Sequence, residues 1–238
     1  MCLIVFAWKL LPHCPLVLAA NRDEFFARPS QAANWWDDHP DVYAGRDLQA
    51  GGTWLGINRS GRFAAVTNIR TGLPKPDDKR SRGELVAQYL AGDMAPLDYL
   101  TQVRDTALDY AGFNLIFGDQ HGLHWITNGD QVTFKSLEPG IYGLSNGSLD
   151  TPWPKVVRAK AQFASLLCQG APDGAYFDML SDTTRASDCR LPKTGVSLEW
   201  ERLLSPICIE SEDYGTRAST LVRLHPGDKA ELHEKLIR

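Results

Sequence analysis

Two short apolar segments at the N-terminus, joined by a proline-containing turn, constrain the fold of this chain more than any other feature of its sequence. Residues 2–8 (CLIVFAW) and 16–21 (LVLAAN) are apolar and rich in strand-forming residues, and Pro12 and Pro15 lie between them. Short runs of this composition, bounded by turn residues, are typical of buried strands. We therefore predict a buried β-hairpin, which brings the start of its first strand beside the end of its second.

The same segment is not expected to be a signal peptide, because it lacks a basic start and Lys9 and His13 interrupt it. No apolar run reaches the roughly 18 residues that would span a bilayer. The five cysteines include no CxxC pair, so neither a disulfide framework nor a zinc site is indicated. The formal net charge of −4 provides no basic face for nucleic acid or an anionic membrane. We therefore expect a cytoplasmic protein with no metal and no nucleic-acid partner.

Blocks of predicted strands alternate with blocks of predicted helices along the remaining chain. A second hairpin is expected over 51–69, and further strands over 113–119, 122–128, 131–137, 140–146 and 216–224. Helical spacing covers 81–92, opened by a capping box of Ser81 and Glu84, and also 96–110 and 153–168. The sequence predicts a loop from 30 to about 50, a polar turn near 74–78, and mixed helix and loop over 170–205, and it leaves the tail from Asp228 ambiguous. This order indicates one α+β domain over residues 1–238 rather than a doubly wound sheet.

Cys2 is the first candidate for chemistry. It follows the initiator methionine, and methionine aminopeptidase is expected to remove Met1 before so small a residue, leaving cysteine with a free α-amine. That amine, with a reference pKa of about 7.7–8.0, can accept the thiol proton and later deliver it to a leaving group. The alternative is that Cys2 only packs within a strand, as most strand cysteines do.

A polar run, Asn21-Arg22-Asp23-Glu24, lies where the second predicted strand ends. The hairpin places this run beside Cys2, where Arg22 would lower the pKa of the thiol and Asp23 would hold the α-amine. The alternative is a solvated turn, which is the usual role of a short charged run. The sequence leaves open which of Asn21, Asp23 and Glu24 contacts the amine.

Two asparagines, Asn68 and Asn146, each follow an apolar predicted strand. Side-chain amides at strand ends can donate hydrogen bonds to a developing oxyanion, which an acyl-transfer enzyme must stabilise. The alternative is structural, because asparagine tolerates turn conformations and often ends strands for that reason.

Several sequence blocks, in this order after an initial Met-Cys, resemble a known family. They are AANRDEFFARP, GGTWLGINRSGRFAAVTNIR, SRGELV, FNLIFGD, YGLSNGSLDTPWPKV and YGTRASTLV. The chain resembles the NRDE family, also called the transport and Golgi organisation protein 2 family. The resemblance extends over nearly the whole chain and weakens between about 170 and 210. Ordered blocks of this length are far more specific than the four letters NRDE.

The resemblance implies a fold and a set of site residues. The family looks like a branch of the N-terminal-nucleophile superfamily, which has an αββα sandwich, and is similar to cysteine-type bile salt hydrolases and penicillin V acylases. Matched motif by motif, the nucleophile, the Arg/Asp pair, the oxyanion asparagine and a second asparagine fall on Cys2, Arg22 with Asp23, Asn68 and Asn146 respectively.

The match with the acylases is incomplete at two places. The acylases separate the arginine from the aspartate by two residues, whereas here Arg22 and Asp23 are adjacent, so Glu24 or Asn21 could take the expected place. The late arginine of the acylases has only Arg217 as a candidate. The nucleophile is therefore better supported than the residues around it.

The resemblance also implies a rival function, because eukaryotic members are associated with haem trafficking and with acyl-lipid or acyl-CoA metabolism. For haem the sequence offers only His121 and His124, a spacing that is usually incidental, and no Cys-Pro dipeptide. Trp35 and Trp36 could line a hydrophobic ligand site, although packing is the commoner use of such residues.

We therefore predict an α+β four-layer sandwich with the N-terminal-nucleophile hydrolase plan. The preferred function is a cysteine amidase-like hydrolase acting on non-peptide C–N or thioester acyl bonds of a small-molecule substrate after Met1 removal, without a cofactor. The alternative is a non-catalytic protein that binds and carries haem or an acyl-lipid or acyl-CoA ligand. The oligomeric state is not predicted.

Overall fold

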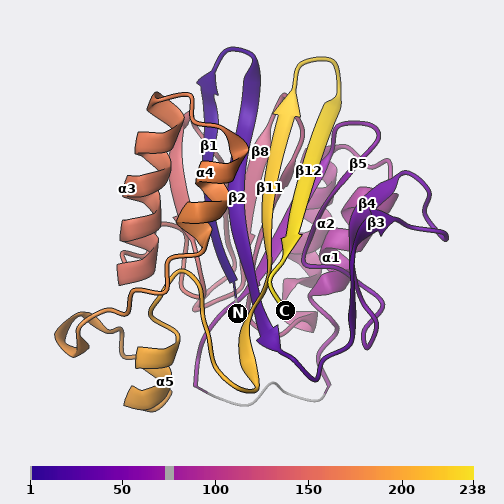
Figure 1. Cartoon of the computed structure of the whole chain (residues 1–238). Coiled ribbons are helices and arrows are strands. Elements are labelled where there is room, and N and C mark those ends of the chain that lie inside the picture. The colour runs from indigo at the N-terminus through magenta and orange to yellow at the C-terminus, as the bar shows by residue number, and fades with distance from the viewer. Residues whose placement is uncertain (1, 73–77) are drawn as a thin grey trace.

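Two antiparallel β-sheets lie face to face in the computed structural model, which describes residues 2–72 and 78–238 (Figure 1). The first sheet contains, in spatial order, β10 (Gly140–Leu144), β1 (Cys2–Leu11), β2 (Cys14–Phe25), β11 (Tyr214–His225) and β12 (Lys229–Leu236). The second contains β3 (Ser30–Trp35), β4 (Val42–Asp47), β5 (Leu55–Asn58), β6 (Phe63–Asn68), β7 (Phe113–Gly118), β8 (Leu123–Thr127) and β9 (Thr133–Ser136).

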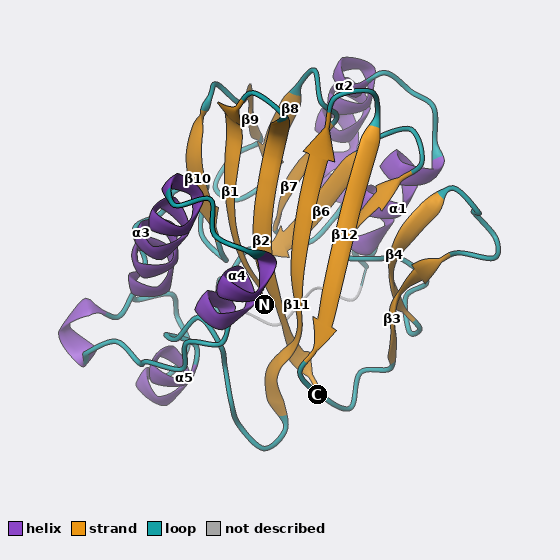
Figure 2. Cartoon of the chain, turned by 45° about the horizontal axis from the view of Figure 1, so that its top comes forward, coloured by secondary structure: helices purple, strands orange, loops and turns teal. Residues whose placement is uncertain are grey.

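Helices cover the outer faces of both sheets (Figure 2). Helices α3 (Pro154–Cys168) and α4 (Asp173–Leu180) pack on the first sheet. Helices α1 (Gly83–Ala91) and α2 (Pro96–Thr106), with the short turn η1 (Ala107–Asp109), pack on the second sheet. Along the chain, η2 (Asp188–Arg190) and α5 (Leu198–Leu203) come between α4 and β11. This arrangement confirms the predicted α+β four-layer sandwich. None of the described helices is long and apolar enough to cross a membrane.

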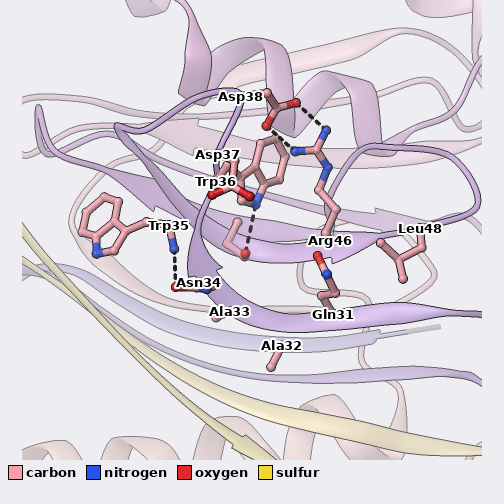
Figure 3. A pocket seen from close by; sticks show the side chains of 11 residues that line it. Gln31, Ala32, Ala33, Asn34, Trp35, Trp36, Asp37, Asp38, Arg46 and Leu48 are labelled. Carbon is pink, nitrogen blue, oxygen red and sulfur yellow. Dashed lines mark hydrogen bonds and ion pairs between the residues drawn. The ribbon is translucent and has the colours of Figure 1, made fainter.

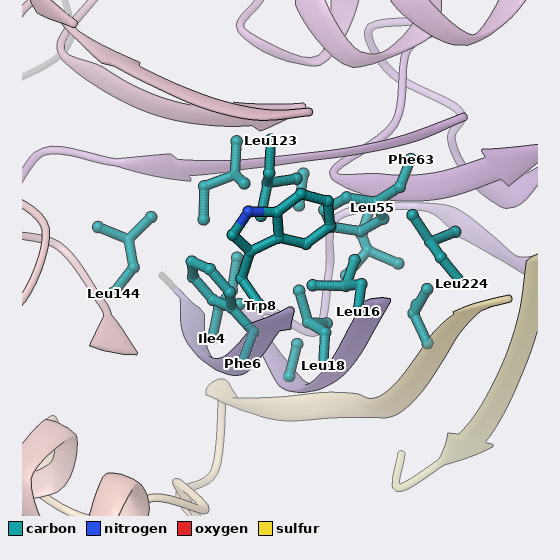
Figure 4. Packing of buried hydrophobic residues seen from close by; sticks show 14 of the residues in the cluster. Ile4, Phe6, Trp8, Leu16, Leu18, Leu55, Phe63, Leu123, Leu144 and Leu224 are labelled. Atoms are coloured by element: carbon teal, nitrogen blue, oxygen red, sulfur yellow. The ribbon is translucent and has the colours of Figure 1, made fainter. Parts of the chain in front are cut away.

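The β1–β2 hairpin is buried on both faces. Ile4, Phe6 and Trp8 of β1 pack into the core between the sheets, together with Leu16 and Leu18 of β2 (Figure 4). The alternate residues of the same strands belong to the core beneath α3 and α4; they are Leu3, Val5, Ala7, Val17 and Ala19. Because successive side chains of a strand point to opposite faces, a strand buried on both sides appears as a continuous apolar run.

This alternation divides the polar end of β2 between the two faces. The Arg22 side chain is on the same face as Leu18 and Ala20, which is the face toward the second sheet. The Asp23 side chain is on the same face as Val17 and Ala19, which is the face toward the helices. The strand continues to Phe25, so the NRDE run lies within β2 and not beyond its end. The fold therefore separates the side chains of two neighbouring residues by the thickness of a sheet.

The sequence prediction of a loop from residue 30 to about 50 is wrong. It contains β3 and β4, which pair antiparallel at the edge of the second sheet. Most of β3 is exposed and its burial does not alternate, so it lacks the periodicity by which a half-buried strand is recognised. The ambiguous tail also becomes a strand, β12, which pairs with β11.

The predicted capping box of Ser81 and Glu84 is also wrong. Helix α1 begins at Gly83, its first turn has no side-chain cap, and the Glu84 carboxylate accepts a hydrogen bond from Arg80 at 3.0 Å. The helix itself was predicted correctly, as were α2, α3 and the strands from β5 to β11. The predicted polar turn near 74–78 and the removal of Met1 concern residues outside the described ranges, apart from Asp78.

The Trp8 side chain is 1% exposed at the centre of the inter-sheet core, so Trp8→Ala is expected to lower the free energy of unfolding by about 3–5 kcal/mol (Figure 4). Chemical denaturation monitored by far-UV circular dichroism measures this loss. The matched control is Trp35→Ala. Because Trp35 is 39% exposed on an edge strand, this substitution should lower the free energy of unfolding by well under half as much. Equal losses in the two variants would contradict the assignment of Trp8 to the core.

Candidate active site

Cys2 and Arg22 are direct partners in the register between β1 and β2. Opposing residues of an antiparallel pair present their side chains on the same face, here the one toward the second sheet. The Arg22 guanidinium lies 3.9 Å from the centre of the Trp54 ring and donates a hydrogen bond to Ser30 at 3.0 Å. These contacts hold the guanidinium on the same face of the sheet as the Cys2 side chain.

A cavity of about 370 Å³ opens between the sheets at this end of the hairpin. Its lining is mainly polar and comes from β1, β2, the 47–54 loop, β6 and the start of α1: Cys2, Arg22, Asp23, Glu24, Arg28, Asp47, Gln49, Ala50, Thr53, Trp54, Val66, Asn68, Ser81, Arg82 and Gly83. The backbones of two of these segments touch near Gly52, where an added Cβ would lie 2.5 Å from the carbonyl carbon of Gly83. Glycine at position 52 therefore allows α1 to begin at the cavity wall.

The ionisation of Cys2 reflects opposing influences. Burial raises the pKa of the thiol, and the negative charge of Asp23 acts in the same direction. The backbone N–H of Asp23 and the Arg22 guanidinium lower this pKa, because both stabilise the thiolate. In the full-length chain burial has the larger effect, so Arg22 acts in the predicted direction without bringing the pKa below its ordinary value.

The Asp23 carboxylate lies in the helix layer, on the other face of the sheet from the Arg22 side chain. Its Oδ1 accepts a hydrogen bond from Thr216 at 2.7 Å, and the Nζ of Lys155 in α3 lies 3.9 Å from Oδ2. Burial raises the pKa of this carboxyl group, while the positive charge of Lys155 opposes that rise. The sheet thus separates the carboxylate from the guanidinium, although both belong to adjacent residues.

Asn21 and Glu24, the other candidates for contact with the amine, have different surroundings. The Asn21 amide donates to the carbonyls of Leu180 at 2.8 Å and Ile207 at 3.0 Å, and its Oδ1 accepts from Ser219 at 2.6 Å. Asn21 therefore ties α4 and the segment before β11 to β2. Glu24 lies on the cavity side, where its carboxylate accepts from the backbone of Phe25.

Asn68 and Asn146 are neighbours, but only Asn68 lines the cavity. The Asn146 amide is fully buried and donates to the backbone carbonyl of Asn68 at 2.8 Å. The adjacent Ser145 hydroxyl donates to the Cys2 carbonyl at 2.9 Å. Within residues 2–72 and 78–238, the Asn68 side-chain amide makes no hydrogen bond, so it can bind a ligand. Asn146 instead fixes the end of β6 relative to β1.

Arg217, the candidate for the late arginine, is not part of the cavity lining. Its guanidinium donates to the backbone carbonyls of Arg28 and Phe25. Arg217 therefore holds the chain where it leaves β2. Two residues that were not predicted lie nearer to the site than Arg217 does. Arg82 lines the cavity, and Lys155 lies beside the Asp23 carboxylate in the helix layer. Both lie in blocks that carry the family resemblance, which was the only sequence signal for them.

The histidines considered for haem lie away from the cavity lining. His124 is buried in β8, where its ring contacts Phe117 and Ser136, and His121 is exposed in the turn before it. The described residues contain no group of histidine, cysteine or acidic side chains that could hold a metal ion.

Trp35 and Trp36 line a separate cavity of about 640 Å³ along β3 and β4 (Figure 3). Trp36 is buried, donates to the Ala44 carbonyl at 3.0 Å, and stacks against Arg46, which forms a bidentate ion pair with Asp38 (Figure 3). Trp36 therefore packs within the protein, whereas Trp35 is 39% exposed at the same cavity.

The sequence matches a known protein family along the chain. Residues 1–238 match the sequence profile described as Transport and Golgi organisation 2. The chain belongs to the Transport and Golgi organisation 2 family. The mouse Transport and Golgi organization 2 homolog is 35% identical over 247 residues, which cover 93% of this chain and 88% of the mouse protein. The human homolog is 34% identical over 248 residues, with the same shares of the two chains.

This member of the Transport and Golgi organisation 2 family also resembles solved structures in its fold. A Caenorhabditis elegans ortholog of N-acylethanolamine-hydrolyzing acid amidase gives a TM-score of 0.57 at 8% identity, covering 92% of this chain and 91% of its own. A mutant conjugated bile acid hydrolase from Clostridium perfringens gives 0.51 at 8% identity, covering 100% and 92%. At such low identity these likenesses establish the shared fold alone.

Asn21→Ala is expected to lower the free energy of unfolding by about 1–3 kcal/mol, because it leaves two buried carbonyls and the Ser219 hydroxyl without a partner. Urea denaturation measures the loss. Gln49→Ala is the control from the same region, since Gln49 is exposed and should change stability by less than about 0.5 kcal/mol. An Asn21→Ala protein as stable as the parent would show that these bonds do not hold α4 in place.

Proposed function

We propose that this protein, after Met1 has been removed, is a cysteine N-terminal-nucleophile hydrolase that cleaves non-peptide C–N or thioester acyl bonds. The observation that carries the proposal is the pairing of Cys2 with Arg22 on the inner face of the hairpin, at a cavity that Asn68 also lines. The similar folds that were compared belong to a protein named as an acid amidase and to one named as a bile acid hydrolase, which supports the same reaction class.

The first half of the reaction transfers the acyl group to Cys2. The α-amine of Cys2 takes the thiol proton as the sulfur attacks the acyl carbonyl, and the carbonyl electron pair moves onto its oxygen. The Asn68 amide, which has no other partner among the described residues, donates to this oxyanion. When the C–N bond breaks, the departing amine takes the proton back from the α-ammonium; with a thioester, the departing thiolate does so.

The second half releases the acid. Water attacks the thioester on Cys2 and gives its proton to the α-amine, which returns it to the sulfur as the C–S bond breaks. Arg22 stabilises the thiolate at the beginning and the end of this cycle. Asn146 acts indirectly, because its bond to the Asn68 carbonyl positions the strand that carries the oxyanion donor.

The direct test is incubation of the purified protein with a panel of acyl amides and acyl thioesters, followed by intact-mass analysis. We expect a chain lacking Met1 that gains the mass of the acyl group on Cys2, and no gain in Cys2→Ala. Cys14→Ala is the matched control, because Cys14 lies at the opposite end of the hairpin and should leave the acyl-enzyme unaffected. Retained Met1 would exclude this mechanism, and a preparation that absorbs as haem would favour the carrier function.

Replacement of Arg22 should shift the ionisation of Cys2. Arg22 lowers the pKa of this thiol, so Arg22→Met is expected to raise it further above its ordinary value. The rate of alkylation of Cys2 by iodoacetamide, measured by peptide mass against pH, should rise at correspondingly higher pH. Arg22→Lys keeps the positive charge and should shift the curve less. Superimposable curves for all three proteins would show that Arg22 does not tune the thiol.

A further inference from the structure

The charged side chain of Lys155 is buried inside the protein. Lys155 is the second residue of α3, it is 2% exposed, and within the described part of the chain its Nζ makes no hydrogen bond. Its nearest acidic group is the Asp23 carboxylate, 3.9 Å away. Burial lowers the pKa of Lys155 to about 8, although Asp23 works against this shift. A buried cation is costly, and the distance to Asp23 is too long for a strong hydrogen bond, so the pair contributes little stability.

Other charged and titratable groups surround the Lys155–Asp23 pair. They come from β1, the segment after β6, α5 and β11, and they are Cys2, Arg70, Glu201 and Tyr214. Arg70 and Glu201 form an ion pair of their own at 2.7 Å, with both side chains 4% exposed, and the Arg70 guanidinium also lies over the Trp153 ring. Burial raises the pKa of Tyr214 well above its ordinary value, so its hydroxyl is uncharged. Lys155 therefore opposes the negative charge of Asp23 more strongly than Arg70 does.

The nitrogen of Cys2 adjoins this cluster. Cys2 is opposite Arg22, and because the strands run antiparallel, its backbone nitrogen lies toward the next residue of β2, which is Asp23. Once Met1 is removed, this nitrogen becomes the α-amine. The cluster holds two cations, Lys155 and Arg70, and two anions, Asp23 and Glu201, so a proton on the amine would add a third positive charge to it.

We propose that Lys155 is a positioning residue that keeps the α-amine of Cys2 uncharged at neutral pH by balancing the charge of Asp23. The proposal rests on the proposed function, because it concerns the amine that serves there as general base. A base must be unprotonated to accept a proton, whereas a carboxylate without a counter-charge would hold the amine as an ammonium ion. Asp23 can then orient the amine without disabling it.

The test measures the pKa of the α-amine in a protein that has no thiol at position 2. In Cys2→Ser the amine is titrated by competitive labelling with acetic anhydride across pH 5 to 10, about three units below and two above its reference value, and the N-terminal peptide is quantified by mass. Adding Lys155→Met should raise the pKa of the amine by at least about one unit, a tenfold change in its protonation equilibrium. Adding Lys160→Met, on the same helix but paired with Asp150 near the surface, should leave it unchanged.

An unchanged pKa in Lys155→Met would overturn the proposal. A second comparison applies if that variant does not fold: Asp23→Asn alone should lower the pKa of the amine, because Lys155 then stands unopposed. In the Asp23→Asn background, Lys155→Met should no longer raise the pKa above that of the parent protein. A rise of the same size with and without Asp23 would show that Lys155 does not act through the carboxylate, and would also overturn the proposal.

The outcome is separable from the hydrolase proposal. With Cys2 intact, the midpoint of the curve of acyl-enzyme formation rate against pH should move to higher pH in Lys155→Met, by the same amount as the pKa of the amine. At high pH the rate should reach the plateau of the parent protein. A merely structural role would lower the rate at every pH without moving the curve, and this result would count against the proposal. If no acyl-enzyme forms in any variant while the shift in Cys2→Ser is observed, the hydrolase function fails and the role of Lys155 stands.

Discussion

Both faces of the β1–β2 hairpin are buried, one against the second sheet and the other beneath α3 and α4, so the register between these strands determines where every nearby polar group lies. A slip of one residue would turn Phe6 and Trp8 into the helix layer and Leu3 and Val5 into the inter-sheet core. The two cores have different opposing residues, so such a slip is strongly disfavoured. The same constraint that packs the apolar residues therefore places Cys2 opposite Arg22.

The sheet separates two electrostatic environments that adjoin the same residue. On the inner face, the Cys2 thiol, the Arg22 guanidinium and the Asn68 amide meet a polar cavity. On the outer face, the Asp23 carboxylate is enclosed with Lys155 beneath the helices, beside the Arg70–Glu201 ion pair. A catalytic thiol and the amine that serves it need different surroundings, since one must become an anion and the other must remain neutral. Adjacent residues of one strand, pointing in opposite directions, can supply both.

Burial has a cost at this site. It raises the pKa of Cys2 and of Asp23, and it lowers that of Lys155, so each of these groups is less easily charged than in water. The opposing charges of Arg22 and Lys155 recover part of that loss because the surroundings are poorly screened. The activation of the thiol in the proposed reaction therefore depends on the α-amine that appears only when Met1 is removed, and not on Arg22 alone.

The local sequence determined much of this protein, because apolar periodicity and turn residues act over short distances. They were sufficient to predict the hairpin, α1 to α3, the strands from β5 to β11 and the proximity of Cys2 to Arg22. They were not sufficient for β3, whose exposed residues carry no alternation, or for the failed capping box at Ser81. Only the tertiary structure decided that Asn146 binds the backbone of Asn68 and that Lys155 faces Asp23 across 132 positions of the chain. Such pairings follow from how the layers stack, and neither residue has a local environment that would indicate its partner.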